Sequence, residues 1–450
     1  MFFSTQKDYG IYSILIKSTL LHYNKKFKSK SKIDYFSKKF FSFKFFLFYI
    51  FQILNLLIFR NREKFLFLKY KNCDIGRHVT ATVYRDASSY KSKFNLYKNY
   101  LRYFLLGGLV VESAIFYSKK SKAIYIDHTG YINGLFFSVF AEKKKIIYTN
   151  CYPRGLFFID FKKKNNFKKR NLEICLKLEK KESISKIKKN YVKKLIFRPS
   201  LIPHIRKQKW HTSKIQNLKK IDYVIYTHSF VDGQLWWGLD GFVNLRDWTE
   251  FTIETLIKKK ANILVKIHPN FFQKIKHDFI KLDIKIFYEL MKKYDYYKGI
   301  TFIDFPIKNE AILNGIRKDT IIVSHHGTAL LEGIARNFKC ISSVATLWSK
   351  EFKLTNSWDS PKNYKKLLNK KWKDLKFANQ NDFLKLEIQL FGNKFSLYGK
   401  NWWQKNIAKI FQIHLHNLIA NPHEISNKIS NKKFHKTVKK VSECIEEVNL

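Results

Sequence analysis

Between residues 216 and 400, short apolar runs alternate with longer segments in which apolar positions recur every three or four residues. The short runs have the length of buried strands and are DYVIYTHSF (222–230), NILVKIHPN (262–270), GITFIDFP (299–306), IIVS (321–324) and CISS (340–343). The segments between them have the period of amphipathic helices, and Asp247 is placed as a possible N-cap of the first one. Strands that alternate with helices predict βαβ units and a parallel sheet, so we expect a Rossmann-like domain over 216–400.

A second strand–turn–helix–strand pattern lies upstream, between residues 123 and 150. It consists of the run AIYI (123–126), the polar turn Asp127-His128-Thr129-Gly130, the helical pattern YINGLFFSVFAEKK (131–144) and the run KIIYTN (145–150). Because this plan repeats that of residues 321–343, we expect a second Rossmann-like domain over 66–215. The predicted fold class is therefore α/β, with two facing Rossmann-like domains and a cleft between them.

The segments 1–65 and 401–450 lie outside these two predicted domains. Lysine clusters in the first lead into the uncharged run FFLFYIFQILNLLIF (45–59), which basic residues follow. A membrane-spanning helix needs about 20 apolar residues, so this run is short for one. Three interpretations stay open: a helix buried against the domain core, a helix lying on an anionic membrane surface, and a true span. The segment 401–450 is predicted as a helical tail.

Lys and Arg outnumber Asp and Glu by 86 to 35, which gives a formal net charge of +51. Such a surplus is typical of proteins that bind nucleic acid or an anionic membrane. The composition is also rich in Lys, Phe, Asn, Ile and Tyr, whose codons are rich in A and T, so nucleotide bias explains part of it. No nucleic-acid-binding module is recognised, and we expect an anionic membrane surface and an anionic substrate, not nucleic acid, as partners.

The cysteine pattern indicates a reducing compartment. The chain has five scattered cysteines and no CxxC pair, which excludes a disulfide framework and a cysteine zinc site. The N-terminal sequence lacks the basic-then-apolar plan of a cleavable signal peptide. We therefore expect a cytoplasmic protein, peripheral on the inner face of the cytoplasmic membrane.

Polar residues follow two predicted strands of the second domain. After IIVS, the turn Ser324-His325-His326-Gly327-Thr328 brings hydroxyls, imidazoles and backbone N–H groups to the start of a helix, an arrangement suited to a phosphate. After ILVKI, His268 ends the strand and the following proline stops the ladder, which aims the imidazole out of the sheet edge. Further candidate donor-binding residues nearby are Lys266, Pro269, Glu332, Ser342 and Ser343.

Two carboxylates are candidates for a general base. Asp232 stands in a glycine turn just past a strand end, and Asp127 holds the corresponding place in the first domain. The candidate acceptor-side residues are His128, Thr129, Gly130, Trp236 and Trp237, of which the two tryptophans could stack on a sugar or base or belong to the core.

No metal or other cofactor is expected. His268, His325 and His326 could bind a metal, but neither their spacing nor a nearby carboxylate pair favours a zinc site. The sequence has no Asp-x-Asp, which is the usual carboxylate pair for a metal–nucleotide-sugar complex, and no GxGxxG or Walker motif. If the donor is a nucleotide sugar, histidines, lysines and helix N-termini would have to stabilise the negative charge of its phosphates in place of a metal.

The motifs KIHPN and SHHGTALLEGIARNFKCISS, with YTHSFVDGQLWWGLDGFVNLRDW, resemble those of the capsular polysaccharide biosynthesis proteins. These are GT-B glycosyltransferases related to capsule Kdo transferases, bacterial sialyl- and polysialyltransferases and CDP-glycerol glycerophosphotransferases. The resemblance covers roughly residues 220–350 and is weak in the first domain. It implies that His268 contacts the donor phosphate, that 324–328 with Ser342 and Ser343 hold the nucleotide, and that Asp232 deprotonates the acceptor. The residue before Asp232 is Val231, where the sialyltransferase motif has an acid.

The resulting prediction is a GT-B glycosyltransferase that moves a sugar from a nucleotide donor, a CMP-sugar, to a surface polysaccharide or lipid-linked acceptor. Other capsule-assembly proteins are implied as further partners. Two alternatives stay open: a GT-B-fold epimerase acting on a UDP-sugar, and a basic protein that binds nucleic acid or a membrane surface without catalysis.

Overall fold

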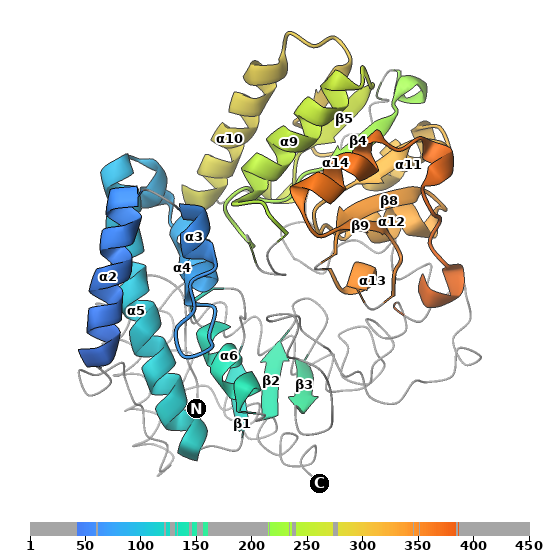
Figure 1. The fold of residues 1–450 in the computed structure, drawn as a ribbon. Helices are drawn as coiled ribbons and strands as arrows, with labels where there is room; N and C mark the ends of the chain where they lie inside the picture. The colour runs from blue at the N-terminus through green and yellow to red at the C-terminus, as the bar shows by residue number, and fades with distance from the viewer. Residues whose placement is uncertain are drawn as a thin grey trace, which may run out of the picture.

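The computed structural model describes two α/β units, one built around β1–β3 and the other around a larger sheet (Figure 1). The described residues are 43–59, 62–120, 123–126, 131–132, 134–143, 146–150, 156–160, 215, 217–233, 235, 240–272, 278–344, 346–350, 352–383 and 386.

The C-terminal unit contains a six-stranded, fully parallel sheet in the order β6-β5-β4-β7-β8-β9. Its strands are β4 (Tyr223–Tyr226), β5 (Ile263–Lys266), β6 (Ile300–Ile303), β7 (Ile321–Val323), β8 (Lys339–Ser343) and β9 (Asn356–Trp358). The chain runs outward from β4 to β6, then returns to the other side of β4 and runs outward again. This is the Rossmann strand order, whose switch point lies between β4 and β7. The predicted α/β fold class with a parallel Rossmann-like sheet is confirmed.

Helices cover both faces of this sheet because alternate strand residues point to opposite sides. Ile225, Val265 and Val323 pack in one core with α9 (Leu245–Lys258), α10 (Asp278–Tyr294) and α14 (Pro361–Asn369). Val224, Leu264 and Ile322 pack in the other core with α11 (Asn309–Gly315) and α12 (Ala329–Ala335). The shorter helices of this unit are η5 (Leu218–Lys220), η6 (Pro269–Phe272), α13 (Leu347–Lys350) and η7 (Trp372–Asp374).

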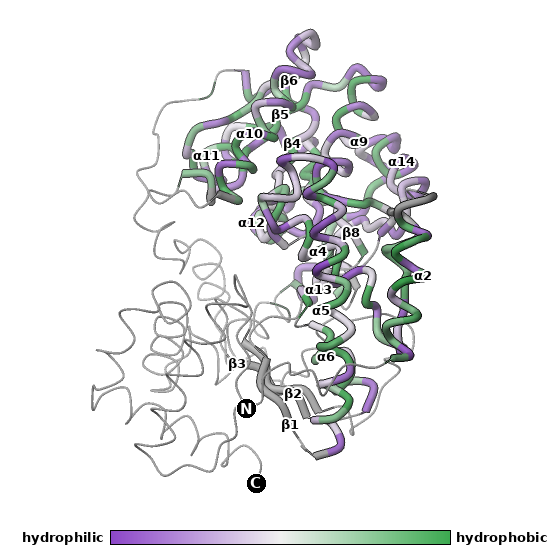
Figure 2. The backbone as a smooth tube through the Cα atoms, turned by 90° about the vertical axis from the view of Figure 1, so that its left-hand side faces the viewer, coloured by the Kyte–Doolittle hydropathy of each residue, from purple (hydrophilic) through white to green (hydrophobic). Residues whose placement is uncertain are grey.

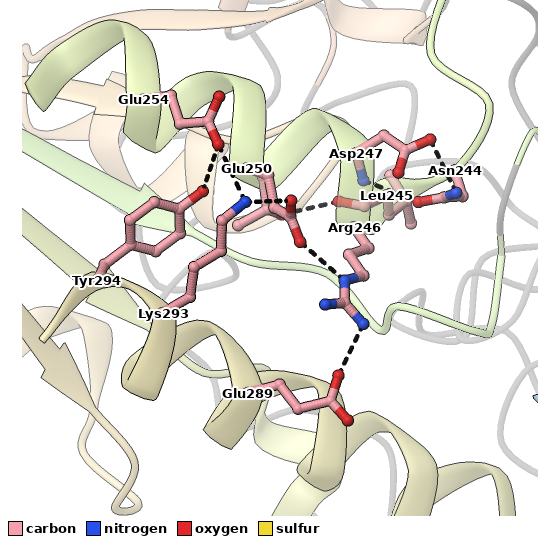
Figure 3. A network of polar contacts seen from close by, with 10 residues as sticks. Asn244, Leu245, Arg246, Asp247, Glu250, Glu254, Glu289, Lys293 and Tyr294 are labelled. Carbon is pink, nitrogen blue, oxygen red and sulfur yellow. Dashed lines mark hydrogen bonds and ion pairs between the residues drawn. The ribbon is translucent and has the colours of Figure 1, made fainter. Parts of the chain in front are cut away.

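The first helix of this unit begins earlier than the sequence pattern predicts. Asn244, not Asp247, is the N-cap of α9, and its side chain accepts a hydrogen bond from the Asp247 backbone N–H. Asp247 stands three residues on and accepts a hydrogen bond from the Asn244 amide (Figure 3). The prediction that Asp247 is the N-cap is wrong because Asn244 fills that role equally well and Leu245 is needed in the core.

Charged side chains tie α9 to α10 along their exposed edges (Figure 3). Arg246 of α9 contacts Glu289 of α10 at 2.8 Å, and Lys293 of α10 contacts Glu250 of α9 at 2.7 Å. These pairs are partly exposed, so they set the alignment of the two helices more than they stabilise the fold.

The N-terminal unit is more helical than predicted. It consists of α2 (Phe43–Phe59), α3 (Arg62–Leu66), α4 (Ile75–Arg85), η2 (Ala87–Tyr90), α5 (Lys93–Lys120), β1 (Ala123–Ile126), α6 (Gly134–Glu142), β2 (Ile146–Asn150) and β3 (Leu156–Asp160). Strands β1 and β2 are parallel on either side of α6, which confirms the predicted strand–helix–strand pattern, and β3 is antiparallel to β2. The predicted helical tail, 401–450, lies outside the described residues.

Helix α2, for which three interpretations were open, packs one face into the core of the N-terminal unit. Phe45, Ile53 and Leu56 are buried there against α5 and its neighbours. A Cβ on Gly108 would stand 1.9 Å from the Phe45 ring, so the glycine allows α2 to approach α5 closely. Among the described helices, α5 is long and apolar enough over 93–119 to cross a membrane, but half of its apolar window is buried in protein.

Two phenylalanines of α2 give a matched test of this packing. The side chain of Phe45 is 1% exposed and that of Phe43 is 69% exposed. We expect Phe45→Ala to lower the free energy of unfolding by about 3–5 kcal/mol, because it leaves a cavity in the core. Phe43→Ala should change it by less than about 0.5 kcal/mol. Urea titration measures both, and equal losses would contradict the packing.

Candidate functional site

Four histidines from three neighbouring strand ends lie together at the switch point of the C-terminal sheet. His228 follows β4, His268 follows β5, and His325 and His326 follow β7. The ring of His228 lies 4.0 Å from that of His326 and 5.0 Å from that of His268. Because β5, β4 and β7 are adjacent and parallel, their carboxyl ends bring these residues to the same sheet edge. Ligands of open α/β sheets bind in this position.

Asp240 fixes the proton arrangement of His325. Its Oδ2 lies 2.5 Å from Nε2 of His325. A ring nitrogen this close to a carboxylate oxygen must carry the proton, because two lone pairs would repel. Burial alone would raise the pKa of Asp240, but His325 and hydrogen bonds from His325 and Ser343 outweigh burial and lower it. Asp240 is therefore a buried carboxylate that holds N–H on Nε2 of His325.

The second nitrogen of His325 connects this carboxylate to the other histidines. Nδ1 of His325 lies 2.8 Å from Nδ1 of His326, so the two rings share one proton across that contact. Burial, followed by the neighbouring His228, His325 and His268, lowers the pKa of His326 well below its ordinary value. A proton that reaches His326 can therefore pass its positive charge on to His325, beside Asp240. The row Asp240–His325–His326 has the geometry of a proton relay.

Aromatic packing keeps this relay dry. The His325 ring meets those of Trp248 and Trp358 edge-on, at centroid distances of 5.5 and 5.8 Å. Gly241, next to Asp240, has φ of +92° and lies where a Cβ would be 2.3 Å from Pro361 Cδ. Only glycine fits there, so the Asp-Gly turn fixes the direction of Asp240.

His228 is uncharged in the folded protein. Burial is the main cause that lowers its pKa to about 4, so its ring is neutral near pH 7.

In the turn Ser324–Thr328, which the sequence predicts to bind phosphate, some polar groups make hydrogen bonds within the protein. The Ser324 hydroxyl donates to the Tyr226 carbonyl at 2.8 Å and accepts from the Gly327 N–H at 3.2 Å. Thr328 is the N-cap residue of α12 but makes no side-chain capping bond. The Ser342 hydroxyl lies in a network with the hydroxyls of Ser349 and Thr355. Ser324 and Ser342 therefore stabilise the turn and the strand end. His325 and Ser343 contact Asp240, and His326 contacts His325.

Lys266 and Glu332 lie together on the α11 and α12 side of the sheet. Nζ of Lys266 donates to Asn309 Oδ1 at 2.5 Å, and Asn309 Nδ2 donates to Glu332 Oε1 at 2.9 Å. Burial lowers the pKa of Lys266 to about 8 and raises that of Glu332. The structure thus joins these two predicted donor-binding residues through one asparagine that the sequence did not single out.

Asp232, the predicted base, is held by the N-terminal unit. Its Oδ1 accepts hydrogen bonds from Arg85 Nη1 and from the Tyr131 hydroxyl. The Tyr131 hydroxyl also accepts the Gly233 N–H at 2.9 Å, and the Arg85 guanidinium lies 5.5 Å from the Phe279 ring of α10. A carboxylate paired with a cation is a weaker proton acceptor, and these contacts give Asp232 a role in joining the two units.

Asp283 of α10 holds the other side of the same loop. Its carboxyl group contacts the Ser229 hydroxyl at 2.5 Å and accepts the Val231 N–H at 3.1 Å. Burial, with the negative charge of Asp232, raises the pKa of Asp283 to about 8. The loop after β4, which carries His228 and Asp232, is therefore fixed from α10 and from the N-terminal unit.

Several predicted site residues lie outside the described residues, and others were missed. Outside are Asp127, His128, Thr129, Gly130, Trp236 and Trp237. His268 and Pro269 follow β5 as predicted. The residues that the sequence did not reveal are His228, Asp240, Asp283, Arg85, Tyr131 and Asn309. Of these, His228 carried a signal, because it stands two residues after an apolar strand.

The described residues contain no group of three or more His, Cys, Asp and Glu side chains arranged to hold a metal ion. The histidine rings contact one another and Asp240, and they suit hydrogen bonding to an anion better than joint coordination of a cation.

Comparisons with known proteins name no family for the chain. No protein-family model and no curated protein matches it. A search of solved structures finds the Methanocaldococcus jannaschii UDP-GlcNAc 2-epimerase in complex with UDP-GlcNAc and UDP, at 14% identity and a TM-score of 0.27. The match covers 62% of this chain and 80% of that chain. The fold assignment therefore rests on the strand order of this sheet, and the resemblance to capsular polysaccharide biosynthesis proteins stays a prediction.

Asp283 predicts a distinctive pH dependence of stability. Its folded-state pKa, about 8, lies above the ordinary value of 3.8, so the folded state binds one more proton between these limits. Its contribution to stability is complete below about pH 4 and falls as pH rises towards 8, by up to about 1.4 kcal/mol per pH unit. Asp283→Asn should remove this slope, whereas the exposed control Asp319→Asn should keep it. Urea midpoints between pH 5 and 8 measure the difference, and parallel curves would contradict the assignment.

Proposed function

We propose that the chain is a glycosyltransferase that moves a sugar from a nucleotide donor, a CMP-sugar, to a polysaccharide or lipid-linked acceptor in surface polysaccharide biosynthesis. One observation carries the proposal: four imidazoles meet where β4, β5 and β7 end, at the switch point of a Rossmann-type sheet. Nucleotides bind at this point in such sheets.

The chemistry of the cluster suits a nucleotide phosphate. A neutral imidazole presents one N–H donor. His325 and His326 use theirs within the relay, so His228 and His268 are the rings that can donate to phosphate oxygens without a metal. Breaking the bond between the sugar and the phosphate leaves negative charge on the phosphate oxygen. Hydrogen-bond donors already positioned for that charge stabilise the transition state. His268, the most exposed partner of His228 in the cluster, is the residue assigned to the leaving phosphate.

The contacts favour His326 over Asp232 as the base that takes the proton from the hydroxyl group of the acceptor substrate. Asp232 is paired with Arg85, whereas His326 is backed by His325 and Asp240. In the step, the acceptor O–H bond breaks and its proton passes to His326. The Nδ1 proton of His326 moves to His325, whose imidazolium then pairs with the Asp240 carboxylate. The freed alkoxide forms the new bond to the sugar.

A panel of nucleotides tests the donor site directly. We expect CMP to raise the melting temperature more than CDP, UDP or GDP, because a ligand of the folded state stabilises it. Isothermal titration should show that His268→Ala weakens CMP binding by at least about tenfold, with an unchanged melting temperature of the free protein. A preference for UDP would overturn the donor assignment. The absence of binding by every nucleotide would overturn the site.

Kinetics separate the two candidate bases. For the CMP-sugar that the chain turns over, Asp240→Asn should lower kcat by about a hundredfold or more and leave CMP affinity nearly unchanged. Asp232→Asn should instead lower the melting temperature, because the Arg85 guanidinium loses its carboxylate partner, and should change kcat less. The reverse ranking of the two kcat values would return the base assignment to Asp232. A UDP-sugar converted to its epimer without any acceptor would favour an epimerase.

A further inference from the structure

Helix α2 exposes a continuous apolar stripe on the face that does not enter the core. The stripe consists of Phe43 (69% exposed), Leu47 (54%), Ile50 (40%), Phe51 (62%) and Leu54 (49%). Steps of three and four residues place these side chains on one side of a helix. Figure 2 shows α2 at the edge of the molecule and coloured as hydrophobic along most of its length.

The core holds this stripe in a fixed direction. Phe45 packs against Phe104 with ring centroids 5.8 Å apart, and the Tyr49 hydroxyl donates to the Leu101 carbonyl at 3.3 Å. Residue numbers thus fall along α5 as they rise along α2, so the two helices are antiparallel. With Phe45 and Ile53 buried on one side, α2 cannot rotate to hide the opposite side.

The composition of α2 is unusual for the surface of a soluble domain. Helices at such surfaces carry charged residues on the outer face. From Phe45 to Phe59, α2 has none. Burying the stripe in an apolar phase would gain about 25 cal/mol for each Å² removed from water. The outer face of α2 therefore suits an apolar environment other than the protein core.

The charge around α2 identifies that environment as an anionic membrane and not a second copy. Lys44, the second residue of α2, and Lys64, in α3, lie near the two ends of the apolar segment and are exposed. The sequence KKFKSKSKIDYFSKK (25–39) has seven lysines and one acid, and it ends four residues before the helix, within about 15 Å of chain. Two copies, each with a net charge of +51, would repel, whereas lipid phosphates attract lysines at about 1 kcal/mol each.

We propose that α2 lies flat on an anionic membrane surface, with its exposed stripe at the boundary between headgroups and acyl chains. Its 17 residues measure about 26 Å, close to the hydrocarbon thickness, but the buried face excludes a span because lipid cannot surround the helix. The neighbouring lysines then contact lipid phosphates, as in other interfacial helices. This inference does not depend on the proposed function.

Vesicle sedimentation tests it with a matched pair of variants. The full chain is mixed with vesicles of phosphatidylcholine alone or with phosphatidylglycerol. The test variant is Leu47→Glu with Phe51→Glu. The control, Tyr296→Glu with Phe377→Glu, adds the same charge at exposed apolar positions of the C-terminal unit, 71% and 48% exposed. Neither variant should lower the melting temperature.

We expect the wild type and the control to bind vesicles that contain phosphatidylglycerol, and the test variant to bind at least about tenfold more weakly. Binding to phosphatidylcholine alone should be weak. The proposal is overturned if the wild type does not sediment with anionic vesicles. It is also overturned if both variants lose the same affinity, because net charge and not the stripe of α2 would then determine binding. It is also overturned if light scattering shows a wild-type dimer that the test variant dissociates without any effect on lipid binding.

Discussion

The pairing of β4 with β7 is the constraint on which the rest of the site depends. Their parallel register, from Tyr223 opposite Ile321 to Ile225 opposite Val323, makes them the two central strands of the sheet. Both strands end at the same edge of the sheet, and the segments that follow them lead to opposite halves of the sheet, β5 and β6 on one side and β8 and β9 on the other. His228 and the pair His325 and His326 must therefore face each other. Hydrophobic burial of the central strands thus determines where the polar groups meet.

The loop after β4 is where stability and chemistry are linked. From one side, buried Asp283 contacts Ser229 and Val231; from the other, Arg85 and Tyr131 contact Asp232. The loop therefore connects α10, the N-terminal unit and the histidine cluster. A change in the charge of Asp283 or the loss of Arg85 would shift His228 without altering any residue of the cluster. The N-terminal unit in this way supports a site that lies on the C-terminal sheet.

Local periodicity was sufficient to predict the strands and helices of residues 222–343, because β4, β5, β7 and β8 are buried on both faces and the helices bury one face. It was insufficient for the site. Asp232 and Asp240 both precede a glycine in the same loop, yet one meets Arg85, 147 residues away, and the other meets His325. The difference lies in tertiary partners, which no local pattern contains. His228 was missed for a related reason, since its importance follows from β4 being central, and strand order is not visible in a single run.

The structure of the chain with CMP bound tests the central claim most directly. The account predicts that the phosphate lies against the rings of His228 and His268, beyond the ends of β4 and β5, with His326 next to it and the Asp240–His325 contact preserved. A nucleotide bound at the outer strands β6 or β9, or on the N-terminal unit with the histidine cluster unoccupied, would contradict it.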